Sequence, residues 1–170
     1  KWEAPAFTQI AADLATAMRD GTPVDHGTPP PDLSAVAAKK VYQPKPAEPV
    51  EGREFGAVLS APRAGYRVGD QVGVTFAGAN PNHDLHRGST YLTVERATGD
   101  DWQRVADDGD WETKLHWKKA GSGQSRITIT WDIPPGVTAG DYRIRYFGDA
   151  LDAAGAVTPF IGTTPRFAVS

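Results

Sequence analysis

The sequence predicts a mainly β chain, an immunoglobulin-like antiparallel β-sandwich preceded by one α-helix and a Pro-rich linker. Three observations support this prediction. Apolar residues recur with helical spacing near the start, prolines crowd the next stretch, and after Gly52 apolar and polar residues alternate with period two. We therefore expect a terminal helix within residues 1–21, a linker over 22–52 and an immunoglobulin-like domain over 53–170.

The predicted helix runs from near Ala4 to Arg19 and has a single apolar face. The residues of that face are Phe7, Ile10, Leu14 and Met18, which recur every three or four positions. A single helix cannot bury its own apolar stripe. We therefore expect this helix to dock on a partner surface, which the linker does not provide.

The linker is defined by its prolines, which rule out regular helix and favour an extended path. They stand at positions 23, 29, 30, 31, 44, 46 and 49. Val36, Val41 and Tyr42 offer apolar anchors, so we expect the linker to lie along a surface.

The β-domain should contain eight or nine short strands separated by Gly- and Asp-rich turns, a spacing typical of immunoglobulin-like sandwiches. The expected strands are 57–59, 66–68, 72–76, 91–95, 102–105, 111–117, 126–131, 142–146 and 166–169. Tyr142 begins a late strand after a tight turn. It is either a tyrosine corner or an ordinary core residue, and both roles are structural.

Composition limits the classes of function. The 170 residues carry a formal net charge of −3 with both signs interspersed, which argues against a nucleic-acid partner. The absence of cysteine excludes disulfides and thiolate metal sites. No apolar run is long enough to span a bilayer. The first residue is Lys1 and no signal peptide follows it, so we expect the sequence to continue a longer chain.

No catalytic set can be assembled from the sequence. No serine lies in a nucleophile-elbow motif beside a histidine and an orienting acid. His83 and His86 have a spacing that can bind zinc, but no third ligand is close in sequence, so polar loop histidines are the simpler interpretation. His116 falls between two larger apolar residues of a predicted strand, which indicates a solvent or interdomain face.

The densest group of carboxylates lies in residues 107–113, with sequence Asp-Asp-Gly-Asp-Trp-Glu-Thr. Oxygen ligands at a turn suit Ca²⁺ or Mg²⁺, although the spacing is not that of an EF-hand. From the residues alone, a solvated acidic turn is the favoured interpretation. The Asn80-Pro81 loop indicates either a contact surface or a tight connection.

Several ordered motifs of the β-domain resemble the C-terminal domain of neutral (neutral/alkaline, zinc-dependent) ceramidases. These motifs are residues 72–81, 89–95, 108–113 with Trp117, 128–134, 140–148, 159–162 and 167–169. Residues 1–21 resemble the last helix of the catalytic domain of that family, followed by its Pro-rich crossover. This would explain the unpartnered apolar stripe.

The resemblance implies an enzyme that hydrolyses the amide bond of ceramide to sphingosine and a fatty acid. It places the zinc ion and every catalytic residue in a catalytic domain that precedes this sequence. It further implies a divalent ion, Ca²⁺ or Mg²⁺, at the interface between the two domains. The expected metal ligands from this chain are Asp110 and Thr113, and His83 and His86 are not part of the pattern.

We therefore expect the non-catalytic C-terminal portion of a neutral ceramidase that supports the catalytic domain of the same enzyme. The expected location is secreted or extracellular, with association of the enzyme with a membrane as the alternative, and contact of this portion with ceramide-containing membrane is indirect. The alternative is an autonomous β-sandwich module that binds a glycan or a protein for another secreted enzyme.

Overall fold

The computed structural model describes residues 45–83 and 89–170, which belong to one unit, Gln43–Ser170. The predicted helix, most of the linker and His86 lie outside the described residues. The strands are β1 (Val58–Ser60), β2 (Gly65–Tyr66), β3 (Gln71–Gly78), β4 (Leu92–Thr98), β5 (Asp101–Asp107), β6 (Thr113–Lys119), β7 (Ser125–Asp132), β8 (Gly140–Leu151), β9 (Val157–Thr163) and β10 (Phe167–Val169). Two short 3₁₀ turns are η1 (Val50–Gly52) and η2 (Pro81–His83).

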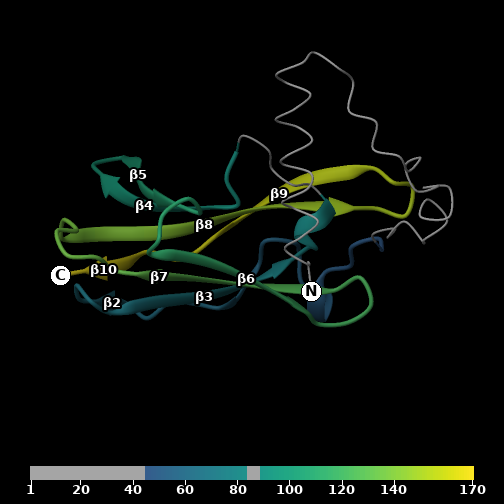
Figure 1. Cartoon of the computed structure of the whole chain (residues 1–170), viewed down its shortest axis with the longest axis horizontal. Coiled ribbons are helices and arrows are strands. Elements are labelled where there is room, and N and C mark those ends of the chain that lie inside the picture. Colours follow the sequence, from purple (N-terminus) through teal and green to yellow (C-terminus); the bar gives the residue numbers. More distant parts are fainter. Residues whose placement is uncertain (1–44, 84–88) are drawn as a thin grey trace, which may run out of the picture. The chain divides into compact units, whose positions relative to one another are not determined.

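The strands form two packed sheets (Figure 1). One sheet has the order β1-β3-β7-β6, and the other has β2-β10-β8-β4-β5 with β9 paired to β8. In immunoglobulin lettering, β1 and β2 are the two halves A and A′ of the first strand, β3 to β8 are B, C, C′, D, E and F, and β10 is G, while β9 is additional. The two orders are then A-B-E-D and A′-G-F-C-C′, which is immunoglobulin topology. The predicted mainly β, immunoglobulin-like sandwich is confirmed. Among the described strands, only β2 and β10 pair in parallel.

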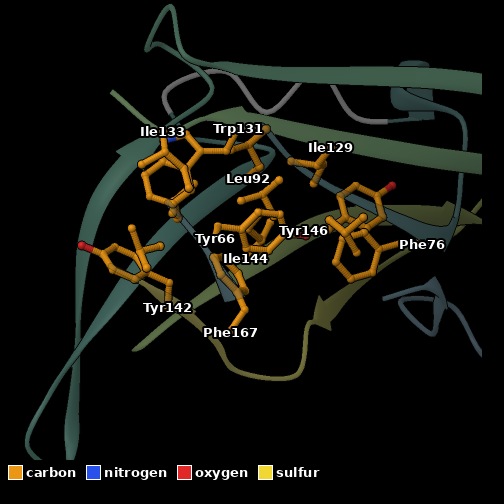
Figure 2. Packing of buried hydrophobic residues seen from close by; sticks show 14 of the residues in the cluster. Tyr66, Phe76, Leu92, Ile129, Trp131, Ile133, Tyr142, Ile144, Tyr146 and Phe167 are labelled. Carbon is orange, nitrogen blue, oxygen red and sulfur yellow. The ribbon is translucent and has the colours of Figure 1, made fainter. Parts of the chain in front are cut away.

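The core lies between the sheets because alternate residues of each strand point inward. In β7 the alternation is complete, and Ile127, Ile129 and Trp131 are fully buried. They meet the inward residues of β4 and β8, which include Leu92 and Ile144 (Figure 2). Ile144 follows Tyr142 by two positions, where antibody domains place the second core cysteine. Aliphatic and aromatic packing therefore occupies the place of the disulfide.

Strand β9 was missed by the sequence prediction. Pro159 lies inside it, and prolines normally indicate an edge strand or no strand. Its exposed residues also hide the alternation that identified the other strands. The strand exists because β8 continues to Leu151, beyond its predicted end at Tyr146, and pairs with β9 over its second half.

Residues 45–52, the end of the predicted linker, lie against the sandwich. The Ala47 amide donates to the carbonyl oxygen of Leu151 at 2.7 Å, and the Glu48 amide donates to that of Gly123 at 3.1 Å. Val50 is 1% exposed. Glu51 forms an ion pair with Arg126 of β7. The chain therefore joins the sandwich beside the β8–β9 hairpin.

Candidate functional site

The acidic turn, residues 107–113, links β5 of one sheet to β6 of the other. Its conformation is fixed by its own hydrogen bonds. The Asp107 amide donates to Asp110 Oδ2 at 2.8 Å, and the Gly109 amide donates to Asp107 Oδ1 at 2.9 Å. The sequence explains this, because aspartate side chains readily accept hydrogen bonds from nearby backbone amides in turns.

Asp108 ties the turn to the residues just before β4. Asp108 Oδ1 lies 2.5 Å from the Thr90 hydroxyl, and Asp108 Oδ2 accepts from the Tyr91 amide at 3.2 Å. Both carboxylate oxygens of Asp108 therefore have partners within the domain. This connection could not be predicted from the sequence, since the two segments pair only in the fold.

The predicted metal ligands, Asp110 and Thr113, lie in this turn but differ in exposure. Asp110 is exposed, and one of its carboxylate oxygens has no hydrogen bond within the described residues. Thr113 is 6% exposed; its hydroxyl donates to the Asp107 carbonyl at 2.5 Å and lies 3.1 Å from the Asp110 carbonyl. In both contacts the hydroxyl faces a carbonyl acceptor, so its oxygen accepts neither of these hydrogen bonds.

These two residues fit a hard cation as part of a ligand set rather than as a complete one. In the described ranges, no group of three His, Cys, Asp or Glu side chains lies close enough to hold a metal ion. Further ligands would have to come from another part of the protein. The metal assignment to Asp110 and Thr113 thus stays a prediction.

Trp111, between the two predicted ligands, is 93% exposed. Among the large apolar side chains that the structure describes as exposed, it has the highest exposed fraction. A tryptophan gains nothing from such exposure in water, and large aromatic side chains are enriched in protein interfaces. The acidic turn therefore presents an aromatic side chain next to its carboxylates.

The histidines of the described residues have structural or surface positions. His83 Nε2 lies 3.1 Å from the carbonyl oxygen of Lys45, and the Leu151 amide donates to His83 Nδ1 at 3.4 Å. His83 therefore links η2 to both the entering chain and the end of β8. His116 is exposed on β6, in agreement with its expected solvent or interdomain face.

The Asn80-Pro81 loop is a tight connection. Asn80 Oδ1 accepts from the Asn82 amide at 3.0 Å, and the His83 amide donates to the Asn80 carbonyl at 3.0 Å. The Tyr91 hydroxyl reaches the Pro81 carbonyl at 3.3 Å. The loop thus packs on the start of β4.

A charged cluster on the outer face of the β4–β8 sheet was not predicted. Glu95 is 7% exposed and accepts from Arg143 at 2.7 Å, while Arg145 lies 3.5 Å from its other oxygen. The Arg143 guanidinium also lies over the Trp102 ring, 4.1 Å from its centroid, and Arg166 lies 5.1 Å from the same centroid. Cross-strand register pairs Glu95 with Arg143, and only that register could have identified the cluster.

No helix within the described parts of the chain has both the length and the apolar character to cross a bilayer.

Comparison with known proteins agrees with the predicted resemblance. Residues 11–169 match the profile of a family described as "Neutral/alkaline non-lysosomal ceramidase, C-terminal". The neutral ceramidase of Mycobacterium tuberculosis is 43% identical over 169 residues, which cover 99% of this chain and 26% of that protein. The neutral ceramidase of Pseudomonas aeruginosa is 36% identical, over 96% of this chain and 26% of that protein.

The crystal structure of the Pseudomonas aeruginosa neutral ceramidase superimposes with a TM-score of 0.79 at 35% identity, covering 97% of this chain and 27% of that one. This chain therefore spans about a quarter of the length of these relatives. The match extends over almost the whole sequence, and it agrees in fold as well as in residues. The chain belongs to the neutral/alkaline non-lysosomal ceramidase family, as its C-terminal domain.

Proposed function

We propose that this chain is the non-catalytic C-terminal portion of an enzyme that hydrolyses the amide bond of ceramide to sphingosine and a fatty acid. Its role is to support the catalytic domain of the same enzyme. The observation that carries the proposal is the match of residues 11–169 to the C-terminal profile of the family. The catalytic residues and the zinc ion then belong to the preceding portion, and the enzyme acts outside the cell, where this portion meets ceramide-containing membrane only indirectly.

The acidic turn supports contact with the catalytic domain. Trp111 is almost fully exposed, and Asp110 keeps an outward carboxylate oxygen beside it. A divalent cation, Ca²⁺ or Mg²⁺, held jointly by Asp110, Thr113 and oxygen ligands of the catalytic domain would neutralise the carboxylates and join the two domains. Such an ion would link the two domains and would take no part in the hydrolysis.

The experiment compares the 170-residue chain, the catalytic portion and the full-length enzyme in a ceramide hydrolysis assay. We expect no amidase activity from this chain alone, low activity or low stability of the catalytic portion alone, and restored activity when the two are joined. Activity of the purified chain would overturn the proposal. Glycan or protein binding by the chain, with no effect on the catalytic portion, would favour an autonomous binding module.

The metal assignment has its own test in the full-length enzyme. Asp110→Ala should lower the bound calcium or magnesium measured by elemental analysis and abolish the rise in melting temperature on calcium addition. Asp152→Ala is the control, because Asp152 lies in the β8–β9 turn, outside residues 107–113, and accepts from the Ala154 and Ala156 amides of that turn. Unchanged metal content and melting in Asp110→Ala would remove the turn as a metal site.

A further inference from the structure

A shallow apolar groove of about 280 Å³ lies on the outer face of the β8–β9 hairpin. Register pairs Phe147 with Ile161 and Asp149 with Pro159, so these four residues lie on one face of the hairpin, where Asp149 is buried at 8% exposure. Thr90, before β4, forms part of the rim. The polar surface within the groove is small, because apolar side chains supply most of its lining.

A glycine permits the close aromatic packing beneath the groove. A Cβ added to Gly148 would lie 2.4 Å from Phe160 Cζ and 2.5 Å from the Tyr146 hydroxyl. Gly148 lets Phe160 pack against Tyr146, with ring centroids 5.6 Å apart, on the core side of the hairpin. The side chains of Phe147 and Pro159, which alternate along the strands with Gly148 and Phe160, border the hollow on the outer face.

The hairpin exposes more apolar surface than its own fold explains. Ile161 is 53% exposed and Val157, on the same face, is 43% exposed. Single exposed apolar residues are ordinary, but a hollow lined with them indicates a contact surface. Arg145 covers one side of Phe147, 5.0 Å from the ring centroid, and gives the groove a charged margin.

One residue connects the rim of the groove to the acidic turn. Thr90 lines the groove and its hydroxyl lies 2.5 Å from Asp108 Oδ1. The entering chain reaches the same hairpin from another side, where the Ala47 amide binds the Leu151 carbonyl. The hairpin is therefore beside residues 45–47, and Thr90 connects the rim of its groove to Asp108 of the acidic turn.

We propose that this groove binds an apolar side chain from the catalytic portion of the same enzyme. The inference rests on the proposed function and names the surface through which the C-terminal portion performs it. The relatives are about four times as long as the matched region, and the match is to their C-terminal part. Within the described residues, the segment that leads from any preceding portion into the sandwich lies beside this hairpin at Ala47.

The size of the groove favours a partner on the same chain. It accommodates one or two side chains, and a contact of that extent buries far less surface than the roughly 1,000 Å² that a stable interface between separate molecules requires. A tethered partner has an effective concentration of roughly millimolar, so weak contacts suffice. The neighbouring carboxylates of Asp107, Asp108 and Asp110 disfavour an anionic membrane surface as the occupant.

Hydroxyl-radical footprinting of side chains tests the proposal directly. The probe is the full-length enzyme compared with the 170-residue chain. We expect oxidation of Phe147 and Ile161 to fall several-fold in the full-length enzyme. Val68, which is 45% exposed and follows β2 at the opposite end of β8, should be oxidised equally in both. Equal oxidation of Ile161 in both proteins would overturn the proposal.

Matched substitutions give a functional test. Ile161→Asp and Val68→Asp place the same charge at sites of similar exposure. In the 170-residue chain, both variants should melt within a few degrees of the parent. In the full-length enzyme, only Ile161→Asp should accelerate proteolytic cleavage between the domains several-fold, and Ile161→Leu should restore the parent rate. If Ile161→Asp leaves cleavage unchanged, or melts the isolated chain early, the groove does not bind the catalytic portion.

The outcomes separate this inference from the proposed function. Protection of another face in the full-length enzyme, with Phe147 and Ile161 still oxidised, would overturn the groove and leave the proposed function standing. No protection anywhere, with no effect of this chain on ceramide hydrolysis, would overturn both. Protection of Ile161 by phosphatidylcholine vesicles but not by the catalytic portion would overturn the proposal in favour of lipid contact.

Discussion

The hydroxyl of Tyr142 donates a hydrogen bond of 2.5 Å to the carbonyl oxygen of Thr138, four residues earlier in the chain. Tyr142 itself is 1% exposed, and its ring lies 5.4 Å from that of Trp131 in the other sheet. This is the tyrosine corner of immunoglobulin-like domains, at the start of the strand that corresponds to F. It fixes the turn that leads into β8, the strand on which both β9 and the groove depend.

Tyr142→Phe should destabilise the chain by about 1–2 kcal/mol, because it removes one hydrogen bond and leaves the Thr138 carbonyl without this donor. The ring remains, so core packing is preserved. Urea unfolding followed by tryptophan fluorescence measures the change. A variant as stable as the parent would show that the hydroxyl does not hold the corner.

Part of this corner could be predicted from the sequence. The turn before Tyr142 and its place in a late strand limited it to a corner or an ordinary core position. Only the position of the Thr138 carbonyl distinguishes these two roles, because the shape of the turn determines whether that carbonyl can accept from the Tyr142 hydroxyl. The alternation of β7 likewise predicted its buried face, since Ile127 and Ile129 occupy every second position.

The hairpin and the groove could not be predicted in the same way. β9 contains Pro159 and exposes most of its residues, so neither propensity nor alternation identifies it. The groove arises from the register that sets Phe147 opposite Ile161 and from the position of Thr90 at their edge. The acidic turn was found as a cluster of carboxylates, but the bond between Asp108 and Thr90 depends on two strands meeting in space.

Gly148→Ala should destabilise the chain by about 1–3 kcal/mol, since the new methyl group overlaps Phe160 and the Tyr146 hydroxyl in a packed core. Gly73→Ala in β3 is the control, because a Cβ there meets no atom within 4 Å. Its stability should equal that of the parent or exceed it slightly. Thermal unfolding of both variants measures the difference, and equal melting temperatures would contradict the packing described for Gly148.

Burial raises the pKa of the Tyr146 hydroxyl above its ordinary value of 10.0, and the neighbouring Asp149 carboxylate adds to the effect. The folded state therefore holds this proton more tightly than the unfolded chain. The resulting stabilisation is complete below pH 10.0 and is lost as the pH rises above it. Burial also raises the pKa of the Tyr142 hydroxyl.

Tyr146→Phe should therefore change the pH dependence as well as the stability. At neutral pH the variant should lose about 1 kcal/mol, because it lacks the hydrogen bond between the Tyr146 hydroxyl and the backbone of Ala79. Above pH 10.0 its unfolding free energy should fall less steeply than that of the parent, and Tyr142 should account for the slope that remains. Urea unfolding between neutral and alkaline pH gives both quantities. Parallel profiles for the two proteins would refute the assignment to Tyr146.

The cluster around Glu95 predicts a large cost for removing one partner of an ion pair. Glu95→Ala leaves two guanidinium groups, Arg143 and Arg145, without their carboxylate on a face where the Arg143 side chain is only 23% exposed. We expect a loss of about 2–3 kcal/mol, below the range for fully buried pairs because part of Arg143 still reaches water. Urea unfolding of the 170-residue chain measures it.

Lys114→Ala is the matched control, since it removes an ion pair with Asp132 in which both side chains are about half exposed. Its cost should stay below about 1 kcal/mol, as water already screens that pair. The two losses of unfolding free energy should also respond differently to salt. Sodium chloride should reduce the small loss of Lys114→Ala. It should leave most of the Glu95→Ala loss in place, because a buried ion pair is screened much less than an exposed one. Equal losses in the two variants would mean that Glu95 behaves as a surface charge, and that the outer face of the β4–β8 sheet is held by packing alone.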